Sequence, residues 1–276
     1  MPPTSPTPPA SPTPPVPTGT DRSGAGDPAR TLELLWRTPG ARPAGRGPRQ
    51  GLTVEEVVAA AIAVADAEGL AALTMRRVAQ RLGVGAMSLY TYVPGKAELL
   101  DLMLDTVFGQ VPRPALSALP WRERVRAVAD ANMAMYRQHP WMLSVATGRP
   151  PLGPGLIAKY DHELSALDGL GLHDVEMDDA LTYLLGFVQA SARLAADARA
   201  ATGQGALSDE QWWAIAGPLL ARVYDAERHP IATRVGAAAG AAHNAAVDPG
   251  HAYRFGLERV LDGLGVLIDR RAAGPA

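Results

Sequence analysis

Hydroxyl-bearing side chains are concentrated in residues 88–92: Ser88, Tyr90, Thr91 and Tyr92. Serine and threonine hydroxyl groups can hydrogen-bond base edges or phosphates, and a tyrosine can donate to a phosphate while its ring packs against a sugar. No acid in this stretch would repel a phosphate. These residue types predict a surface that contacts a nucleic acid.

A short helix over residues 86–92 would gather these side chains on one face. Leu89 and Val93 lie one turn apart and are expected to face the core. The opposite side then presents Ala86 and Met87, which can meet the methyl group of thymine. Such a face fits the major groove, which is about 12 Å wide.

The preceding residues predict the helix that positions this face. Thr74 is a favourable N-cap, and the free backbone N–H groups that follow it form a phosphate site. Apolar residues recur at helical spacing at Met75, Val78, Ala79 and Leu82. The turn over residues 83–85 (Gly-Val-Gly) then leads into the short helix. A helix, a tight turn with glycine and a second helix make up a helix-turn-helix.

Two further helices would complete this unit. The first is expected to begin after Thr53, which matches a capping box with Glu56, and to stop at Gly69. Its apolar stripe consists of Val54, Val57, Val58, Ala61, Ile62 and Ala65. The second is expected from Lys96 to about Gln110, after a break at Pro94-Gly95.

The cations Arg76, Arg77 and Lys96 lie on either side of the short helix in the sequence. The acids of this region lie on the first helix at Glu55, Glu56, Asp66 and Glu68, and at Glu98. The formal net charge of −2 gives no global argument for a nucleic-acid partner. Periodicity and charge alone therefore leave open an ordinary three-helix core with solvated arginines.

Residues 52–104 resemble the DNA-binding domain of the TetR family of transcriptional repressors. The resemblance lies in the segments 73–84, 88–93 and 96–101. The resemblance implies that four residues contact DNA phosphates: Thr74, Tyr90, Tyr92 and Lys96. It implies that five others contact bases: Arg76, Ala86, Met87, Ser88 and Thr91. Tyr92 stands where many family members have histidine. The remaining chain weakly resembles the tetracycline-repressor type of C-terminal domain.

Residues 1–50 are expected to form a disordered proline-rich tail and a basic arm. Met1–Thr20 contains nine prolines and no charged side chain, so it cannot build a core. Residues 36–50 carry arginines and no acid, at Arg37, Arg42, Arg46 and Arg49. One interpretation is a solvated linker. The other is a DNA arm made by Arg42, Arg46 and Arg49, because arginine arms beside a helix-turn-helix commonly reach phosphates or the minor groove.

Beyond residue 110 the pattern is helical, over residues 121–138, 154–167, 174–201, 209–227 and 251–271. The stretch 232–249 is interpreted as loop or frayed helix. No strand-type alternation is present, so the chain is predicted to be all-α. A three-helix helix-turn-helix domain over residues 51–110 is joined to a helical bundle over residues 111–276 that dimerises and binds a ligand.

The expectation of a homodimer rests on two apolar helices. Residues 180–192 carry no charge, with Leu181, Leu184, Leu185 and Val188 on one face and Tyr183, Phe187 and Ala190 on another. The last helix has an apolar stripe at Leu257, Val260, Leu261, Leu264, Leu267 and Ile268. Intrachain packing is the alternative. A two-fold dimer is favoured because one helix-turn-helix reads only a half-site of a palindrome.

Candidate pocket residues are the methionines, aromatics and one amide of the bundle: Asn132, Met133, Tyr136, Met142, Tyr160, Tyr183 and Phe187. Plain core packing is the alternative for each. The ligand is expected to be a small, largely apolar effector. His139 and His162 are interpreted as structural or surface groups, and neither a metal site nor a cofactor is predicted.

The sequence thus favours a transcriptional regulator, a ligand-released repressor of a palindromic double-stranded operator. An activator of the same fold, or a helical small-molecule-binding protein without DNA function, is the alternative. An enzyme is disfavoured because no Gly-rich phosphate loop, metal motif or nucleophile elbow is present. The absence of cysteine, of a secretory signal and of a membrane-length apolar run fits a cytoplasmic protein.

Overall fold

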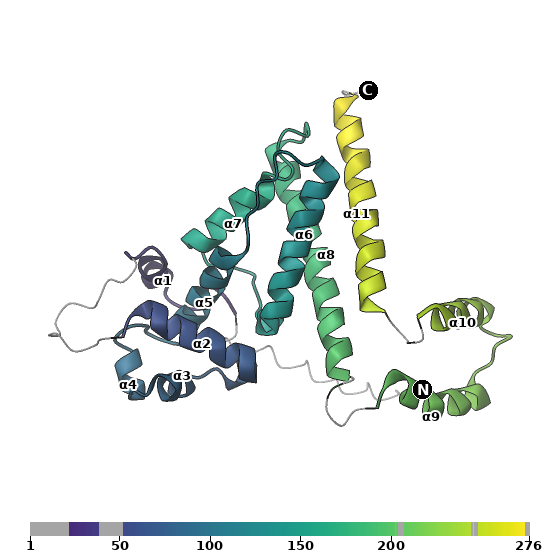
Figure 1. Cartoon of the computed structure of the whole chain (residues 1–276), viewed down its shortest axis with the longest axis horizontal. Helices are drawn as coiled ribbons and strands as arrows, with labels where there is room; N and C mark the ends of the chain where they lie inside the picture. The colour runs from purple at the N-terminus through teal and green to yellow at the C-terminus, as the bar shows by residue number, and fades with distance from the viewer. Residues whose placement is uncertain are drawn as a thin grey trace, which may run out of the picture.

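The computed structural model describes residues 22–38, 52–201, 203, 207–243, 245 and 248–273. These residues form helices, and their one β-type contact is an isolated bridge between Arg22 and Ala146. A helix-turn-helix unit lies at one end of the molecule, with longer helices standing beside it (Figure 1). The predicted all-α class is confirmed.

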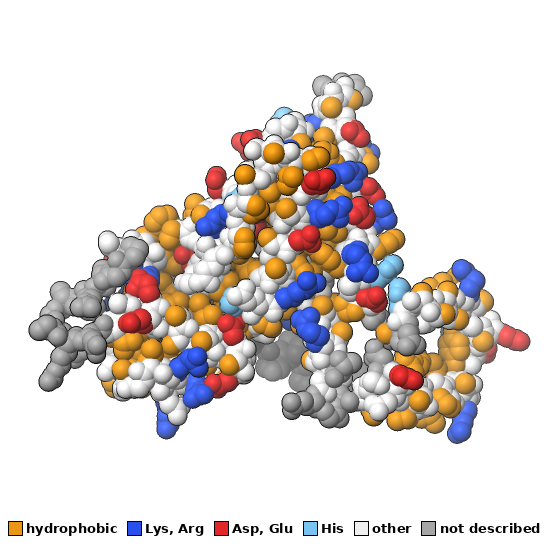
Figure 2. All heavy atoms as spheres, in the orientation of Figure 1, with side chains coloured by type: hydrophobic (Ala, Val, Ile, Leu, Met, Phe, Trp, Pro, Cys, Tyr) orange, Lys and Arg blue, Asp and Glu red, His pale blue; other side chains and the backbone are white. Residues whose placement is uncertain are grey.

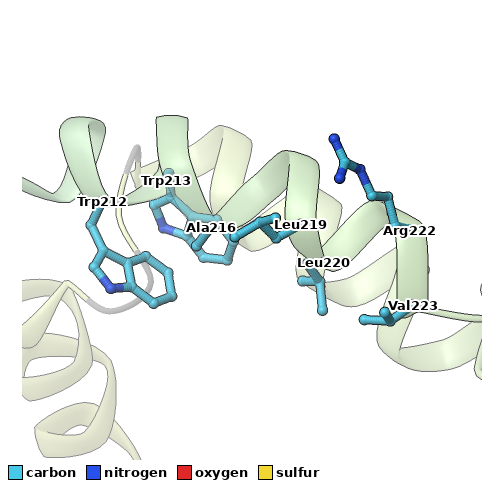
Figure 3. Close-up of a pocket in the computed structure, with 7 residues that line it drawn as sticks. All are labelled: Trp212, Trp213, Ala216, Leu219, Leu220, Arg222 and Val223. Carbon is cyan, nitrogen blue, oxygen red and sulfur yellow. The ribbon is translucent and has the colours of Figure 1, made fainter.

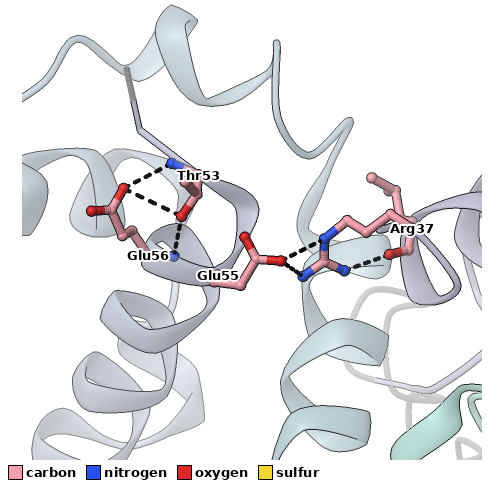
Figure 4. A network of polar contacts seen from close by, with 5 residues as sticks. Arg37, Thr53, Glu55 and Glu56 are labelled. Atoms are coloured by element: carbon pink, nitrogen blue, oxygen red, sulfur yellow. Dashed lines mark hydrogen bonds and ion pairs between the residues drawn. The ribbon is translucent and has the colours of Figure 1, made fainter. Parts of the chain in front are cut away.

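The helix-turn-helix unit is built from α2 (Val54–Glu68), α3 (Met75–Leu82), α4 (Ala86–Leu89) and α5 (Lys96–Gln110). Helix α2 begins where expected because Thr53 and Glu56 form a capping box (Figure 4). The N–H of Thr53 donates to Glu56 Oε2 at 2.8 Å, and the N–H of Glu56 donates to Thr53 Oγ1 at 3.2 Å. The helix ends at Gly69, whose φ of +83° favours glycine, and η1 (Leu70–Ala72) leads on to α3.

The core of this unit extends beyond the boundary predicted at residue 110. Its apolar cluster includes Trp141 and Met142, which lie in η2 (Pro140–Ser144). Asp66, near the end of α2, strengthens this junction: its Oδ1 accepts a hydrogen bond from Trp141 Nε1 at 2.9 Å and lies 2.8 Å from His139 Nδ1. The two domains therefore share packed residues where η2 meets α2.

Helix α5 also packs closely along α7 (Pro154–Leu164). The carboxylate of Asp105 on α5 accepts hydrogen bonds from the first free N–H groups of α7, from Gly155 at 3.2 Å and Leu156 at 2.8 Å. A Cβ at Gly155 would lie 2.0 Å from the carbonyl oxygen of Asp105. The two helices can approach this closely only because residue 155 has no side chain.

A second core joins α6 (Trp121–Gln138), α8 (Asp174–Ala201) and α11 (Pro249–Ala272). Its apolar residues come from the predicted stripes, including Leu181, Leu184 and Val188 of α8 and Leu257, Val260, Leu261 and Leu264 of α11. Tyr253 of α11 donates its hydroxyl to Asp130 Oδ1 on α6 at 2.8 Å. The bounds of α6 and α8 match the prediction, whereas α7 ends at Leu164 rather than 167 and α11 begins at Pro249 rather than 251.

Two helices stand apart from both cores. In Figure 1, α9 (Asp209–Val223) and α10 (Pro230–His243) form a hairpin to one side of α8 and α11. The predicted helix over 209–227 ends earlier, at Val223, and much of the stretch 232–249 interpreted as loop or frayed helix belongs to α10. Alanine is the best helix former, so the alanine-rich sequence of α10 is consistent with a helix despite its glycines.

The N-terminal prediction needs correction. Part of the segment expected to have no fixed structure forms α1 (Pro28–Leu35), which packs against α5. Asp27 caps this helix by accepting hydrogen bonds from the N–H groups of Ala29 and Arg30, Pro28 occupies a favourable first position, and Leu35 is buried. The arm residues Arg42, Arg46 and Arg49 lie outside the described residues.

Replacing Gly155 with alanine should lower the free energy of unfolding by about 1–3 kcal/mol, because the added methyl group forces α7 away from α5. Urea unfolding of the purified protein measures the change. Gly236→Ala in α10 is the matched control, since a Cβ added there would have no described atom within 4 Å outside its own helix turn. Equal effects of the two substitutions would contradict the close α5–α7 contact.

Candidate DNA interface and effector cavity

The exposed side of α4 carries the residues predicted to meet DNA. Met87 is 81% exposed and Tyr90 is 45% exposed, and Thr91 is exposed beside them. The hydroxyl of Thr91 donates to the carbonyl oxygen of Ser88, which holds the two residues together. Leu89 faces inward and is fully buried. The short helix therefore presents one face outward, as its spacing predicts.

Two predicted contact residues lie partly against the core. Ala86 and Tyr92 are half-buried and pack on the first apolar cluster. The ring of Tyr92 is therefore fixed by packing, and the side chain of Ala86 is only partly available to a base. Helix α4 ends at Leu89 and continues as a turn, so Tyr90, Thr91 and Tyr92 lie on a turn rather than on the predicted helix over residues 86–92.

The turn between α3 and α4 has the geometry of a helix-turn-helix. Thr74 caps α3 by accepting a hydrogen bond from the N–H of Arg77 at 3.1 Å. Helix α3 ends at Gly83, whose φ of +69° and ψ of 27° are in the left-handed region. Gly85 then begins α4.

The cations around this face differ in their surroundings. Arg77 forms an ion pair of 2.6 Å with Glu68 and also donates to Gln80 Oε1 at 2.9 Å. The hydrogen bond from Arg77 lowers the pKa of the Glu68 carboxyl. Arg76 is exposed on α3, and Lys96 is half-buried at the start of α5. Basic side chains are visible over α3 at the lower edge of the molecule in Figure 2.

Arg37, the first arginine of the basic flank, is held by protein groups. Its guanidinium donates to Glu55 Oε1 on α2 at 3.0 Å and 2.8 Å, and to the carbonyl oxygen of Leu34 (Figure 4). Arg37 therefore ties the end of α1 to α2 instead of extending toward a nucleic acid.

Helix α5 of the helix-turn-helix unit carries three buried acids. Glu98, Asp101 and Asp105 are each less than a tenth exposed, and Asp101 is fully buried. The carboxylate of Asp101 accepts two hydrogen bonds from the N–H of Gly24, at 3.0 Å and 3.1 Å. Burial raises the pKa of Asp101 to about 6, the Gly24 N–H opposes this rise, and the charge of Glu98 adds to it.

The bundle contains a cavity of about 190 Å³ between α6, α7 and the residues that follow α5. Its walls are mainly apolar, with Val111, Leu116 and Val128 among them, and its polar groups include Lys159 and Glu163 of α7. Lys159 and Glu163 are 5% and 4% exposed. This is a concave apolar site with a few fixed polar groups, the usual character of a small-molecule site.

The polar groups of this cavity are tied together. Lys159 Nζ lies 2.7 Å from the Glu163 carboxylate, and Asn132 Nδ2 donates to the same carboxylate and to the carbonyl oxygen of Val128. Lys159 also stands over the ring of Phe108, 5.5 Å from its centroid. Burial lowers the pKa of Lys159, and burial beside the Glu163 charge raises the pKa of Tyr136 to about 12.

The predicted pocket residues are not gathered in this cavity. Asn132 lies behind Glu163, whereas Met133 and Met142 belong to the second and first core clusters. Tyr136 packs between both clusters, and Phe187 stacks on Tyr253 with ring centroids 5.9 Å apart. Tyr160 and Tyr183 are 38% and 66% exposed in the single chain and are not among the residues that line this cavity, so their place in a ligand pocket stays a prediction.

The sequence did not lead to the polar residues that line the cavity between α6 and α7. Lys159 is one of two lysines in a chain that otherwise uses arginine, and it stands four residues before Glu163 on one helix face. That pairing is a signal from which the site could have been found. His162 also lines the cavity, and burial lowers its pKa, although its isolation in the sequence suggested a structural or surface group.

A second hollow lies on α9, lined by Trp212, Trp213, Ala216, Leu219, Leu220, Arg222 and Val223 (Figure 3). The two indole rings meet edge to face with centroids 4.9 Å apart. Val223 is 82% exposed and Leu219 is 55% exposed, so this surface is apolar and uncovered in the single chain. Large exposed apolar patches of this kind mark interaction sites.

Two family models match the chain. One, described as bacterial regulatory proteins of the tetR family, matches residues 57–103, and the other, a tetracyclin repressor-like C-terminal domain, matches residues 113–268. The HTH-type transcriptional repressor DrrR1 of Streptomyces coeruleorubidus is 44% identical over 253 residues, which are 91% of each chain. This chain belongs to the TetR family.

Solved TetR-family structures share the fold. The TetR family protein ActR of Streptomyces coelicolor, in complex with (S)-DNPA, is 30% identical, with a TM-score of 0.64 over 79% of this chain and 99% of that one. In its complex with actinorhodin, ActR is also 30% identical, with a TM-score of 0.64 over 78% of this chain and 96% of that one. TetR-family proteins are transcriptional regulators, not a family of enzymes, and they bind DNA, dimerise and bind small molecules.

The described residues of this TetR-family chain contain no group of three or more His, Cys, Asp or Glu side chains that could hold a metal ion. No helix among them is long and apolar enough to cross a membrane.

The buried Asp101 carboxyl predicts a pH-dependent stability. Its pKa is about 6 in the folded protein and about 3.9 in an unfolded chain, so between these values the folded state binds more protons. Its contribution to the free energy of unfolding therefore falls as pH rises from 4 to 6, by at most about 3 kcal/mol.

Asp101→Asn should remove this dependence while keeping one oxygen that accepts from Gly24. Urea titrations at pH 4 and pH 7 should show the variant gaining stability relative to the wild type as pH rises. Asp179→Asn, at an exposed site on α8, serves as the control. A constant difference between Asp101→Asn and wild type across this range would refute the prediction.

Proposed function

We propose that this regulator is a repressor that binds a palindromic operator as a homodimer and is released by a small effector. The observation that carries the DNA-binding part is the outward face of α4, with Met87, Tyr90 and Thr91 exposed and no acid among residues 84–96. DrrR1, at 44% identity, is named as a repressor. An activator of the same fold is the alternative, and a reporter gene behind the operator would distinguish the two.

The proposed contacts divide into two sets. Thr74, Tyr90, Tyr92 and Lys96 bind phosphates and orient the unit. Arg76, Ala86, Met87, Ser88 and Thr91 face base edges in the major groove. The exposed Arg76 suits a base contact, since Arg77 is already paired with Glu68. Arg42, Arg46 and Arg49 remain a proposed arm. A DNA-binding regulator acts in the compartment that holds the chromosome, which supports the cytoplasmic assignment.

The homodimer is supported by apolar surface that the single chain leaves uncovered. Tyr183 of α8 and Val266 and Phe255 of α11 are at least half exposed, although both helices contribute their other faces to the second core. The α9 surface in Figure 3 adds to this area. A second copy that covers these faces would bring two recognition units to one palindrome.

The effector is proposed to occupy the cavity beside Lys159 and Glu163. Its apolar walls favour a flat or compact apolar molecule. Lys159 and Glu163 neutralise each other and burial lowers the pKa of His162, so Arg113 is the lining cation that would favour an acidic group on the effector. ActR, solved with (S)-DNPA and with actinorhodin, supports a small-molecule effector in this fold.

Release requires the effector to bind one conformation of the dimer more tightly than the other. Helix α7 lines the cavity and is held to α5 through Asp105, and α5 ends the helix-turn-helix unit. A displacement of α7 would therefore move α5. The two recognition helices would then no longer match major grooves about 34 Å apart.

The double variant Arg76→Ala/Tyr90→Ala should bind DNA about 100-fold more weakly than the wild type, because each contact is worth roughly 1–3 kcal/mol. Electrophoretic mobility shift with a duplex enriched by the wild-type protein from a random library measures the loss. Arg270→Ala, exposed near the end of α11, is the charge-matched control. Unchanged affinity of the double variant would rule out this face as the DNA surface.

A second test addresses the effector class. We expect 1-naphthoic acid to raise the melting temperature of the wild type more than its methyl ester does, because ligand bound to the folded state stabilises it. Arg113→Gln should remove the preference for the acid, because Lys159 is already paired with Glu163, and Lys159→Met/Glu163→Gln, which leaves the net charge of the cavity unchanged, should keep it. If the ester binds as well as the acid to the wild type, the proposed acidic effector is wrong.

A further inference from the structure

Residues 22–37, here called the strap, cross from the helical bundle to the helix-turn-helix unit. At its start, the N–H of the buried Ser23 donates to the carbonyl oxygen of Ala146 at 3.0 Å, and the Ser23 hydroxyl donates to the carbonyl oxygen of Arg149. At its end, Trp36 Nε1 donates to the carbonyl oxygen of Leu152 at 2.8 Å. Both ends of the strap are thus bound to the loop before α7.

Between these ends the strap is bound to α5 and α2. The N–H of Gly24 donates to both oxygens of Asp101, and the N–H of Asp27 donates to Glu98 Oε1 at 3.2 Å. Arg37 then pairs with Glu55 of α2 at 2.8 Å. The carboxylates of α5 are therefore satisfied largely by backbone N–H groups from outside the helix-turn-helix unit.

The path of the strap fits its surroundings closely. Gly24 has a φ of +66°, and a Cβ there would lie 2.8 Å from Arg149 Cβ. A Cβ at Gly26 would lie 2.4 Å from Glu98 Oε1. Glycine is required at residue 24 by its left-handed backbone, whereas a side chain at residue 26 would displace the end of the Glu98 side chain.

The helix-turn-helix unit is consequently held to the bundle at separate points. On one side Asp66 of α2 binds His139 and Trp141. On the other the strap joins α5 and α2 to residues 146–152. Asp105 of α5, bound to the N–H groups of Gly155 and Leu156, is a third attachment.

We propose that the strap is a positioning element for DNA binding, which fixes the angle of the helix-turn-helix unit relative to the bundle. Two such units in a dimer must reach grooves at a set separation, and apparent affinity falls in proportion to the fraction of molecules in the competent arrangement. The strap raises that fraction without touching DNA. This inference rests on the proposed DNA face on α4.

The test compares Gly24→Val with Ala25→Val in the full-length chain. Valine at residue 24 meets Arg149 and an unfavourable φ, whereas Ala25 is exposed, so the same side chain displaces the strap only in the first variant. We expect Gly24→Val to bind the library-enriched duplex about tenfold more weakly, with an unchanged dependence of log affinity on log salt, because no phosphate contact is lost. Ala25→Val should bind like the wild type.

Hydrogen exchange shows whether the strap has detached and the remaining core has stayed folded. A second variant, Ser23→Ala/Trp36→Phe, removes hydrogen bonds from both ends of the strap without adding bulk, and the same loss of affinity is expected. Detachment with affinity within twofold of the wild type would overturn the proposal, as would a reduced salt slope. A wild-type protein that enriches no duplex would overturn the proposed DNA-binding function instead, before any variant is compared.

Discussion

The structure depends on the need of the buried carboxylates of α5 for hydrogen-bond partners. Helix α5 packs against both the helix-turn-helix unit and the bundle. Asp101 and Asp105 of α5 lie among apolar side chains and would destabilise the fold without partners. Their partners are backbone N–H groups, of Gly24 for Asp101 and of Gly155 and Leu156 for Asp105. Helix α5 is thereby bound to the N-terminal segment at Asp101 and to α7 at Asp105. The positions of these two acids set where the N-terminal segment and α7 lie.

This arrangement links the candidate DNA surface to the candidate effector site by direct contacts. The cavity beside Lys159 lies on α7, Asp105 joins α7 to α5, and α5 closes the core on which Leu89 of α4 packs. The backbones of α5 and α7 approach closely at Gly155, so a displacement of α7 toward α5 would meet the α5 backbone directly. The chain of contacts is short and runs through buried, packed groups, which transmit displacement better than flexible side chains on a surface do.

Local signals in the sequence predicted the helix-turn-helix well, because its caps and turns are encoded by neighbouring residues. Thr53 with Glu56, Thr74 and Gly83 act through contacts within a few positions. The N-terminal segment could not be derived in that way, and at the cavity only the Lys159–Glu163 pair is local in the sequence. Asp101 contacts Gly24 and Asn132 contacts Glu163, and such pairs, far apart in the chain, leave no periodic signal. Tyr183 looked buried because residues 180–192 carry no charge, but a segment at an uncovered surface has the same composition.

The shared core at Asp66 has a consequence for engineering. Regulators are often recombined by fusing the DNA-reading part of one to the sensing part of another, and a cut near residue 110 follows the boundary that the sequence suggests. Here such a cut would replace Trp141 and Met142 with foreign residues and leave the Asp66 carboxylate without its indole donor. A working hybrid would have to keep residues 139–145 with the DNA-reading part, or carry matching residues from its new partner.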